Sequence, residues 1–328
     1  MGQPDGWIGQ QLNRPECVLA HESGLLLVPN WSENGGISLI DRTGTRHVSS
    51  RHPFPLRPNG IALESGGTVL LAHMGDTEGG IYRLHADGDV DPVVMTVAGD
   101  PMPPTNFVVK DHHDRIWITV STRLTPRAAD YRASANTGFI AMAEPGESNA
   151  RIVADGLGYT NECVIDEVRG QVWVNETFGR RLTRFKLHDT GQLRLDGAEV
   201  VCQFDAATYP DGLALDEDGH VWITSIVSNR IIRVSPTGTI QLMFEDAEEA
   251  HLAWTEAAYR NDSLGREHLD NAGGEVMRNL SNLAFGGPDR QRMYVGNLLG
   301  DSLPWFDTEF TGVAMPHWSV NLGSLAAD

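Results

Sequence analysis

The sequence predicts an all-β protein, a six-bladed β-propeller with one lid insertion in blade three and a second between blades five and six. One pattern recurs six times: a polar residue opens a short apolar strand, a tight turn follows, and a second strand carries a large apolar residue 11 or 12 positions after the opener. The openers lie 43 to 71 residues apart, which suits one four-stranded unit per repeat with insertions. They are Glu16, Asn59, Asn106, Asn161, Asp211 and Asn282.

The strands follow from short runs of apolar and β-branched residues that glycine or aspartate turns separate. Asp211 opens the clearest copy, and Trp222 lies on its second strand. The second and third strands of blades one to six are expected at 25–28 and 36–41, 68–73 and 80–84, 115–120 and 138–142, 171–175 and 181–185, 220–224 and 230–234, and 293–297 and 303–306. Residues 1–13 hold one strong apolar pair, Trp7 and Ile8, and are expected to close the last blade with an outer strand.

Two longer segments interrupt the repeat. The insertion at 123–137 falls within blade three, and 245–278, rich in Ala, Glu and Leu, is expected to be partly helical. Both connect elements at the mouth where the openers gather, so both are expected to overhang it as lids. His251, Trp254 and Tyr259 are candidates to close over a substrate, although packing of a helix on the blades predicts the same pattern.

Composition limits the classes of partner. The 328 residues are expected to form one domain over 1–328, because six similar repeats favour a single unit. A net charge of −19 argues against nucleic acid. No apolar run approaches the roughly 20 residues of a membrane helix. The start does not resemble a signal peptide, and three cysteines fit a reducing compartment, so we expect a cytoplasmic protein; a homo-oligomer is left open.

The openers suggest a metal site. The first strand of each propeller blade lines the central channel, so the openers should form one polar ring at its mouth. Carboxylate and carboxamide oxygens are the ligands of a hard divalent cation such as Ca²⁺, Mg²⁺ or Mn²⁺, with Zn²⁺ less expected. Without a cation between them, the carboxylates of Glu16 and Asp211 would repel one another. Asn and Asp side chains that cap turns, or a cation that only holds the blades together, remain the alternatives.

Two further side chains fall near the mouth by the geometry of the repeat. His73 is a candidate for proton transfer, and Arg123 for orienting an acidic or hydroxylated substrate. Each also has an ordinary structural explanation, as a packed histidine and a solvated arginine.

The repeats carry a resemblance that spans nearly the whole chain. The segments Pro58-Asn59-Gly60-Ile61-Ala62-Leu63, Thr160-Asn161-Glu162 and Pro210-Asp211-Gly212-Leu213-Ala214-Leu215-Asp216, with Arg14-Pro15-Glu16, resemble the SMP-30/gluconolactonase family of regucalcin-like lactonases. The resemblance implies a divalent metal held by Glu16, Asn161 and Asp211, and Ca²⁺ is the cation that we expect first. It also implies hydrolysis of a lactone, with Asp211 as ligand and general base and Asn106 in contact with substrate or water.

The sequence departs from the family at the positions that contact the hydroxyl groups of a sugar substrate. Pro104 stands where the family has an arginine, Phe107 where Asp is common, and Glu162 where Gly is usual. Phe107 would suit an apolar ring, so a less polar lactone or ester joins sugar lactones as a candidate substrate. Glu162 is a second, less favoured candidate for the general base.

Other functions fit the same ring. A metal-dependent esterase or phosphotriesterase is the nearest alternative, because the same cation polarises P=O as it does C=O. A metal-assisted isomerase is another, since fold does not fix chemistry. A cation-binding scaffold for proteins is a different class, and the two lids over the mouth argue against it.

Overall fold

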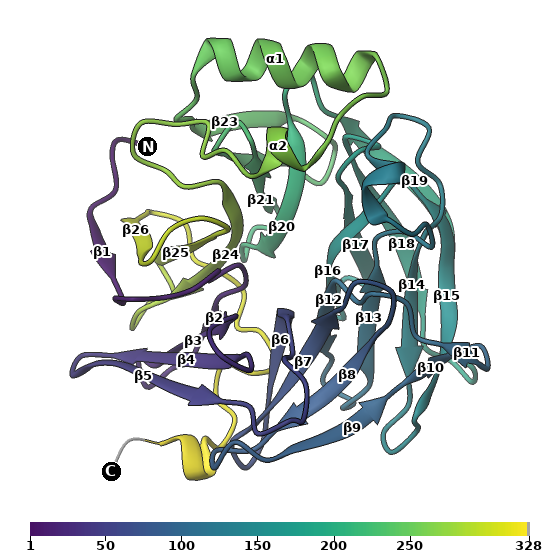
Figure 1. Ribbon diagram of the computed structural model, residues 1–328, viewed down its shortest axis with the longest axis vertical. Helices are drawn as coiled ribbons and strands as arrows, with labels where there is room; N and C mark the ends of the chain where they lie inside the picture. The colour runs from purple at the N-terminus through teal and green to yellow at the C-terminus, as the bar shows by residue number, and fades with distance from the viewer. Residues whose placement is uncertain (327–328) are drawn as a thin grey trace.

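The computed structural model describes residues 1–326 and is a six-bladed propeller, with the blades following one another around a common centre (Figure 1). Blades one and two comprise β2 (Leu19–Ala20), β3 (Leu26–Asn30), β4 (Gly36–Asp41) and β5 (Gly44–Ser49), then β6 (Pro58–Glu64), β7 (Thr68–Met74), β8 (Gly79–Leu84) and β9 (Val90–Val94). Blades three and four comprise β12 (Phe107–Lys110), β13 (Ile116–Val120), β14 (Gly138–Ala143) and β15 (Asn149–Leu157), then β16 (Thr160–Asp166), β17 (Gln171–Glu176), β18 (Arg181–His188) and β19 (Arg194–Gln203).

Blade five comprises β20 (Tyr209–Leu215), β21 (Val221–Ile226), β22 (Arg230–Val234) and β23 (Ile240–Phe244), and blade six has β24 (Leu280–Gly286), β25 (Arg292–Asn297) and β26 (Leu303–Asp307). The short strands β10 (Thr96–Val97) and β11 (Asp100–Pro101) extend the sheet of blade three.

The fourth strand of blade six comes from the other end of the chain. Strand β1 (Gly6–Ile8) pairs antiparallel with β26, and Gly6 lies opposite Trp305. A Cβ atom on Gly6 would lie 2.6 Å from the Trp305 ring, so the close approach of the two strands requires glycine here. The predicted closing strand is confirmed, and it joins the two ends of the propeller (Figure 1).

Both predicted insertions are present. The 3₁₀ turn η1 (Arg127–Asp130) lies between β13 and β14, and α1 (Glu249–Arg260) and α2 (Arg266–Leu269) lie between β23 and β24. Another turn, η2 (Gly323–Leu325), lies near the C-terminus. No helix within residues 1–326 is long and apolar enough to span a bilayer.

The predicted tryptophans are buried in the blades, and two are anchored by an aspartate in the preceding turn. Trp222 Nε1 donates to Asp216 Oδ2 at 3.0 Å, and Trp117 Nε1 donates to Asp111 Oδ2 at 2.8 Å. The corresponding turn of blade four is one residue longer, and the indole N–H of Trp173 has no partner there. The extra residue in this turn explains why Trp173 follows its opener Asn161 by 12 positions, and it accompanies the loss of the hydrogen bond that the other two tryptophans make.

β-Bulges aim the ring residues into the channel. In blade two, Pro58 pairs with His73 and Ile61 with Leu71, so Asn59 and the residue after it oppose a single residue of β7. The same irregularity occurs in the first strands of blades four, five and six. Because a bulge redirects the side chains of its two residues, the opener faces one way along the channel and the next residue faces the other.

The alignment of blade six is wrong by one residue. Ala284 pairs with Tyr294, as Ala214 pairs with Trp222, so Ser281 occupies the opener position and Asn282 the one after it. A slip of one residue moves a side chain to the opposite face of a strand. Asn282 therefore does not belong to the polar ring.

Candidate metal centre and active site

Five of the six predicted openers line one small cavity, of about 60 Å³, at a mouth of the channel. Both insertions contribute to its walls: Arg127 and Tyr131 come from the blade-three insertion, and Arg266 and Leu269 from α2. The remaining wall is partly aromatic. The openers in this cavity are Glu16, Asn59, Asn106, Asn161 and Asp211, and all five are buried.

A chain of hydrogen bonds links these five side chains in blade order. Asn59 Nδ2 donates to Glu16 Oε1 at 2.6 Å and, more weakly, to Asn106 Oδ1 at 3.3 Å. Asn106 Nδ2 donates to Asn161 Oδ1 at 2.7 Å, and Asn161 Nδ2 donates to Asp211 Oδ1. The two carboxylates are the two ends of this chain, on the blades that flank blade six. Blade six places only a serine at this level, so no amide separates them.

The two carboxyl groups are poorly solvated. Burial raises the pKa of Glu16 to about 7, with Arg14 acting in the opposite direction. Burial, and then repulsion from Glu16, raises the pKa of Asp211 well above its ordinary value. Both groups therefore resist ionisation unless a positive charge joins them.

The residues present fit a hard divalent cation. Glu16 Oε2 is buried and has no hydrogen-bond partner in the part of the chain that the structure describes. Two carboxylates and a carboxamide oxygen form the donor set that Ca²⁺ and Mg²⁺ prefer, without sulfur or imidazole. A cation among Glu16, Asn161 and Asp211 would occupy the orphaned oxygen and remove the repulsion between the carboxylates.

A second acidic cluster lies away from the channel mouth and is already satisfied by the protein. Asp216 accepts hydrogen bonds from Trp222 Nε1 and from Arg233 Nε, the latter at 2.9 Å. Asp218, the exposed member of the cluster, lies 3.6 Å from Arg233, and His220 completes it. The buried arginine supplies the positive charge here, so this cluster is a structural ion-pair network.

The structure places Phe107 and Glu162 outside the ring cavity. Both follow an opener directly, and both line a larger cavity of about 220 Å³ inside the channel, as Asn282 does. The two Glu162 oxygens accept hydrogen bonds from Asn282 Nδ2 at 2.9 and 2.8 Å. Burial, then repulsion from Glu16 and Asp211, raises the pKa of Glu162 well above its usual range. Because Glu162 lines the other cavity, its position leaves Asp211 as the base candidate beside the ring.

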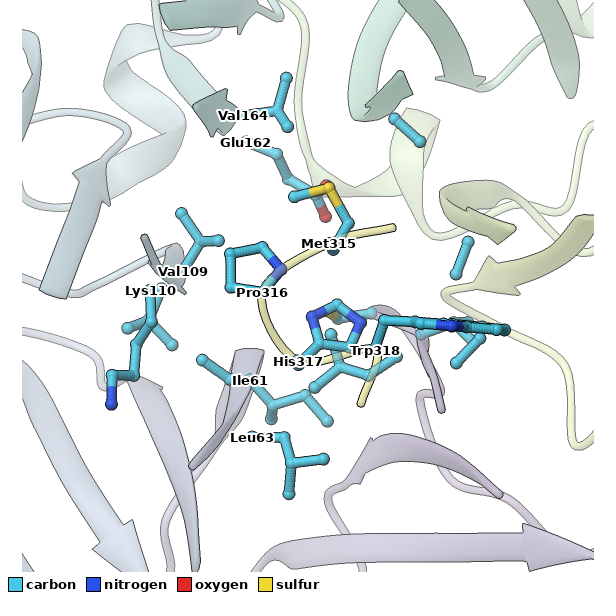
Figure 2. A pocket seen from close by; sticks show the side chains of 18 of the residues that line it. Ile61, Leu63, Val109, Lys110, Glu162, Val164, Met315, Pro316, His317 and Trp318 are labelled. Carbon is cyan, nitrogen blue, oxygen red and sulfur yellow. The ribbon is translucent and has the colours of Figure 1, made fainter. Parts of the chain in front are cut away.

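The larger cavity is mainly apolar, and a segment of the C-terminal tail crosses it. Figure 2 shows Met315, Pro316, His317 and Trp318 running across the opening, with Glu162 at the far side. Burial lowers the pKa of His317 to about 4. This cavity is larger than the ring cavity, but the convergent acidic and amide groups lie in the smaller one.

His73 and Arg123 do not line either cavity. His73 Nδ1 accepts a hydrogen bond from the backbone N–H of Arg57 at 3.0 Å, and burial lowers the pKa of His73 to about 4. Arg123 lies over the Phe139 ring and pairs with Asp155 at 2.8 Å. These contacts favour a structural role for both side chains, with His73 packed in its blade and Arg123 paired at the surface.

The three lid candidates also lie outside the ring cavity. Trp254 stacks on His268, with His251 beside it, and Tyr259 OH donates to the backbone carbonyl of Phe178 at 2.6 Å. These contacts fix α1 against α2 and blade four. It is therefore α2 that reaches the cavity.

Three arginines of the ring cavity were missed by sequence reasoning. Arg14, Arg127 and Arg266 all line it, together with Tyr159 and Phe178. Arg14 precedes the first opener by two residues, and its charge at that position of the repeat is a signal that could have identified it. The other two lie in the insertions, which have no counterpart in the other blades.

Comparison with known proteins identifies related chains. A family model described as SMP-30/Gluconolactonase/LRE-like region matches residues 15–245, which include the three predicted metal ligands. No curated protein matches the sequence significantly.

Solved structures of similar fold include a gluconolactonase from Xanthomonas campestris, with 16% identity, TM-score 0.64, and 93% of this chain and 91% of that chain covered. A calcium-binding regucalcin from Agrobacterium tumefaciens has 15% identity, TM-score 0.64 and coverages of 96% and 97%. A luciferin-regenerating enzyme has 14% identity, TM-score 0.63 and coverages of 96% and 100%. At these identities, the structural likeness shows the fold alone.

Proposed function

The chain belongs to the SMP-30/gluconolactonase/LRE-like family, and on that premise we propose that it is a divalent-cation-dependent hydrolase that opens a lactone ring. The observation that carries the proposal is the pair of buried carboxylates at the ends of the ring, one of them with an oxygen that has no hydrogen-bond partner among the described residues. Ca²⁺ is the proposed cation, with Mg²⁺, Mn²⁺ and Zn²⁺ as the other candidates.

Glu16, Asn161 and Asp211 would hold the cation. When bound, such a cation polarises a carbonyl or phosphoryl oxygen and lowers the pKa of water. Asp211 accepts the proton of the attacking water in this proposal, and the Asn161 amide that donates to Asp211 Oδ1 holds the carboxylate in place. Asn106, held by its bond to Asn161, presents its side chain to the substrate. Water supplies a hydroxyl to the acyl carbon, the ring C–O bond breaks, and the released alkoxide takes the proton.

A panel of substrates separates this function from the alternatives. Initial rates would be measured on sugar, aliphatic and aromatic lactones, on aryl esters and on phosphotriesters, with the same cation present. The proposal expects lactones to have the highest kcat/KM. A higher kcat/KM for aryl esters or phosphotriesters would assign the protein to those chemistries. If the substrate rearranges and no ring-opened acid forms, the protein would be an isomerase.

Cation binding itself is tested by a substitution at the orphaned oxygen. Glu16→Gln is expected to weaken Ca²⁺ binding at least about tenfold, because the site loses one of its two carboxylate charges. Isothermal titration calorimetry measures the affinity directly. The matched control is Asp218→Asn, which changes the exposed member of the outer acidic cluster and is expected to bind Ca²⁺ as the wild type does. The reverse ranking of the two variants would move the metal site to the outer cluster.

A further inference from the structure

Two guanidinium groups of the ring cavity have no carboxylate partner. Within residues 1–326, neither Arg14 nor Arg127 forms an ion pair, and the Nε atom of each is buried without a hydrogen-bond partner. Arg14 lies over the Trp31 ring, 4.4 Å from its centroid. Arg127 donates to Ser121 Oγ at 3.1 Å and weakly to Asn106 Oδ1 at 3.4 Å. Both therefore retain donors for a further group in the cavity.

The three buried arginines of the described residues are paired. Arg115 binds Asp111 at 2.6 Å, Arg180 binds Glu256 at 2.7 Å, and Arg233 binds Asp216 at 2.8 Å. Arg266, the third arginine of the ring cavity, pairs with Asp270. A buried guanidinium without a counter-charge is costly, so the fold elsewhere supplies one. Arg14 and Arg127 are half-buried, but within residues 1–326 neither has an ion pair, and their Nε atoms are buried in the cavity where a ligand is expected.

The charges of the cavity point to the sign of that ligand. When a divalent cation is bound, Glu16 and Asp211 would both be ionised, and the cation would cancel their two negative charges. Arg14 and Arg127 would then leave two positive charges in a cavity of about 60 Å³. If no cation binds, the same two arginines simply balance the two carboxylates. The two situations make different predictions about anions.

Building on the proposed lactonase function, we propose that the substrate carries a carboxylate beside its lactone ring and that Arg14 and Arg127 bind this group. The planar guanidinium fork matches a carboxylate with two parallel hydrogen bonds. Hydrolysis then adds water across the ring C–O bond and yields a hydroxy dicarboxylate. This preference differs from that for a neutral sugar lactone.

Binding of an unreactive acid tests the anion site without requiring turnover. The probes are tetrahydrofuroate, its uncharged amide and inorganic phosphate, titrated calorimetrically into the Ca²⁺-loaded protein. The acid is expected to bind at least about tenfold more tightly than the amide, as charge-assisted hydrogen bonds to guanidinium predict. Tighter binding of phosphate than of the acid would replace the carboxylate with a phosphoryl group. Equal binding of acid and amide would overturn the proposal.

Two variants test the arginines independently, so misfolding of one leaves the other informative. Arg14→Met and Arg127→Met are each expected to reduce binding of the acid about tenfold to 100-fold and to leave binding of the amide unchanged. Arg51→Met is the matched control, because Arg51 is exposed and pairs with Asp89. If the two variants instead bind Ca²⁺ more tightly and bind the acid as the wild type does, the arginines only balance the ring carboxylates and the proposal fails.

Turnover separates the failure of this inference from that of the proposed function. A γ-butyrolactone that carries a carboxylate beside its ring oxygen is compared with γ-valerolactone, which carries a methyl group there. Hydrolysis of both at equal kcat/KM would sustain the lactonase and overturn the anion site. Arginine-dependent binding of the acid without hydrolysis of any lactone would sustain the anion site and overturn the lactonase.

Discussion

An Asp211→Asn variant is expected to lose at least about 100-fold in kcat, the effect of removing a general base. The substitution keeps the size of the side chain and the polar contact with Asn161 while removing the group that accepts the proton. One of the two ring carboxylates is also lost, so Ca²⁺ affinity has to be measured and the assay run at saturating cation. An undiminished kcat under those conditions would exclude Asp211 as the base.

Glu162→Gln is the companion measurement, because Glu162 is the other carboxyl near the ring. Its oxygens face the Asn282 amide in the larger cavity, so the variant is expected to retain kcat within about tenfold of the wild type. A loss in Glu162→Gln that matches the loss in Asp211→Asn would show that the proton moves toward the inner cavity instead. The pair of variants thus decides between the two candidate bases.

An Asp216→Ala variant is expected to lose about 3 to 5 kcal/mol of unfolding free energy, because it breaks a buried ion pair from one side. Arg233, whose side chain is 8% exposed, would keep its charge without the Asp216 carboxylate, and the indole N–H of Trp222 would lose its acceptor. Urea denaturation followed by tryptophan fluorescence measures the change.

Asp166→Ala is the control for the turn itself. Asp166 occupies the corresponding turn of blade four, but it bonds only to the N–H and guanidinium of Arg169, which is 36% exposed, and not to Trp173. The expected cost is about 1 kcal/mol or less, as for a surface pair. Equal losses in Asp216→Ala and Asp166→Ala would mean that the buried network of blade five adds no stability beyond the turn.

The repeat carries most of the information about the fold. Each copy fixes one inner strand and one second strand, so the number of blades, their order and the closing role of residues 1–13 follow from the sequence. The positions of the insertions also follow, because they interrupt the period. Which residues of an insertion enter the cavity does not follow: Arg127 and Arg266 have no equivalents in other blades to set their register.

The error in blade six shows where the period is least reliable. Asn282 matches the polar character of the other openers, whereas the true counterpart is Ser281, followed by a longer turn before Tyr294. An alanine follows the opener by three residues in blades two and five, as Ala62 and Ala214 show, and Ala284 fits this pattern only when Ser281 is the opener. In these three blades the alanine in the strand is a better guide to the register than the polar character of the opener.

The same one-residue step explains Phe107 and Glu162. Their neighbours in the chain, Asn106 and Asn161, are ring residues, yet the adjacent side chains line different cavities. Proximity in sequence therefore overstated their proximity to the proposed chemistry.

Acid release by metal-stripped protein decides whether lactone hydrolysis depends on a divalent cation. The protein would be treated with a chelator, and Ca²⁺, Mg²⁺, Mn²⁺ or Zn²⁺ restored singly while a pH-stat records acid from neutral and carboxylate-bearing lactones, with Asp211→Asn as the blank. We expect no acid release without a cation, and release with at least one cation that the Asp211→Asn blank does not show. Equal release with and without cations, or none with any of them, would contradict a cation-dependent lactonase.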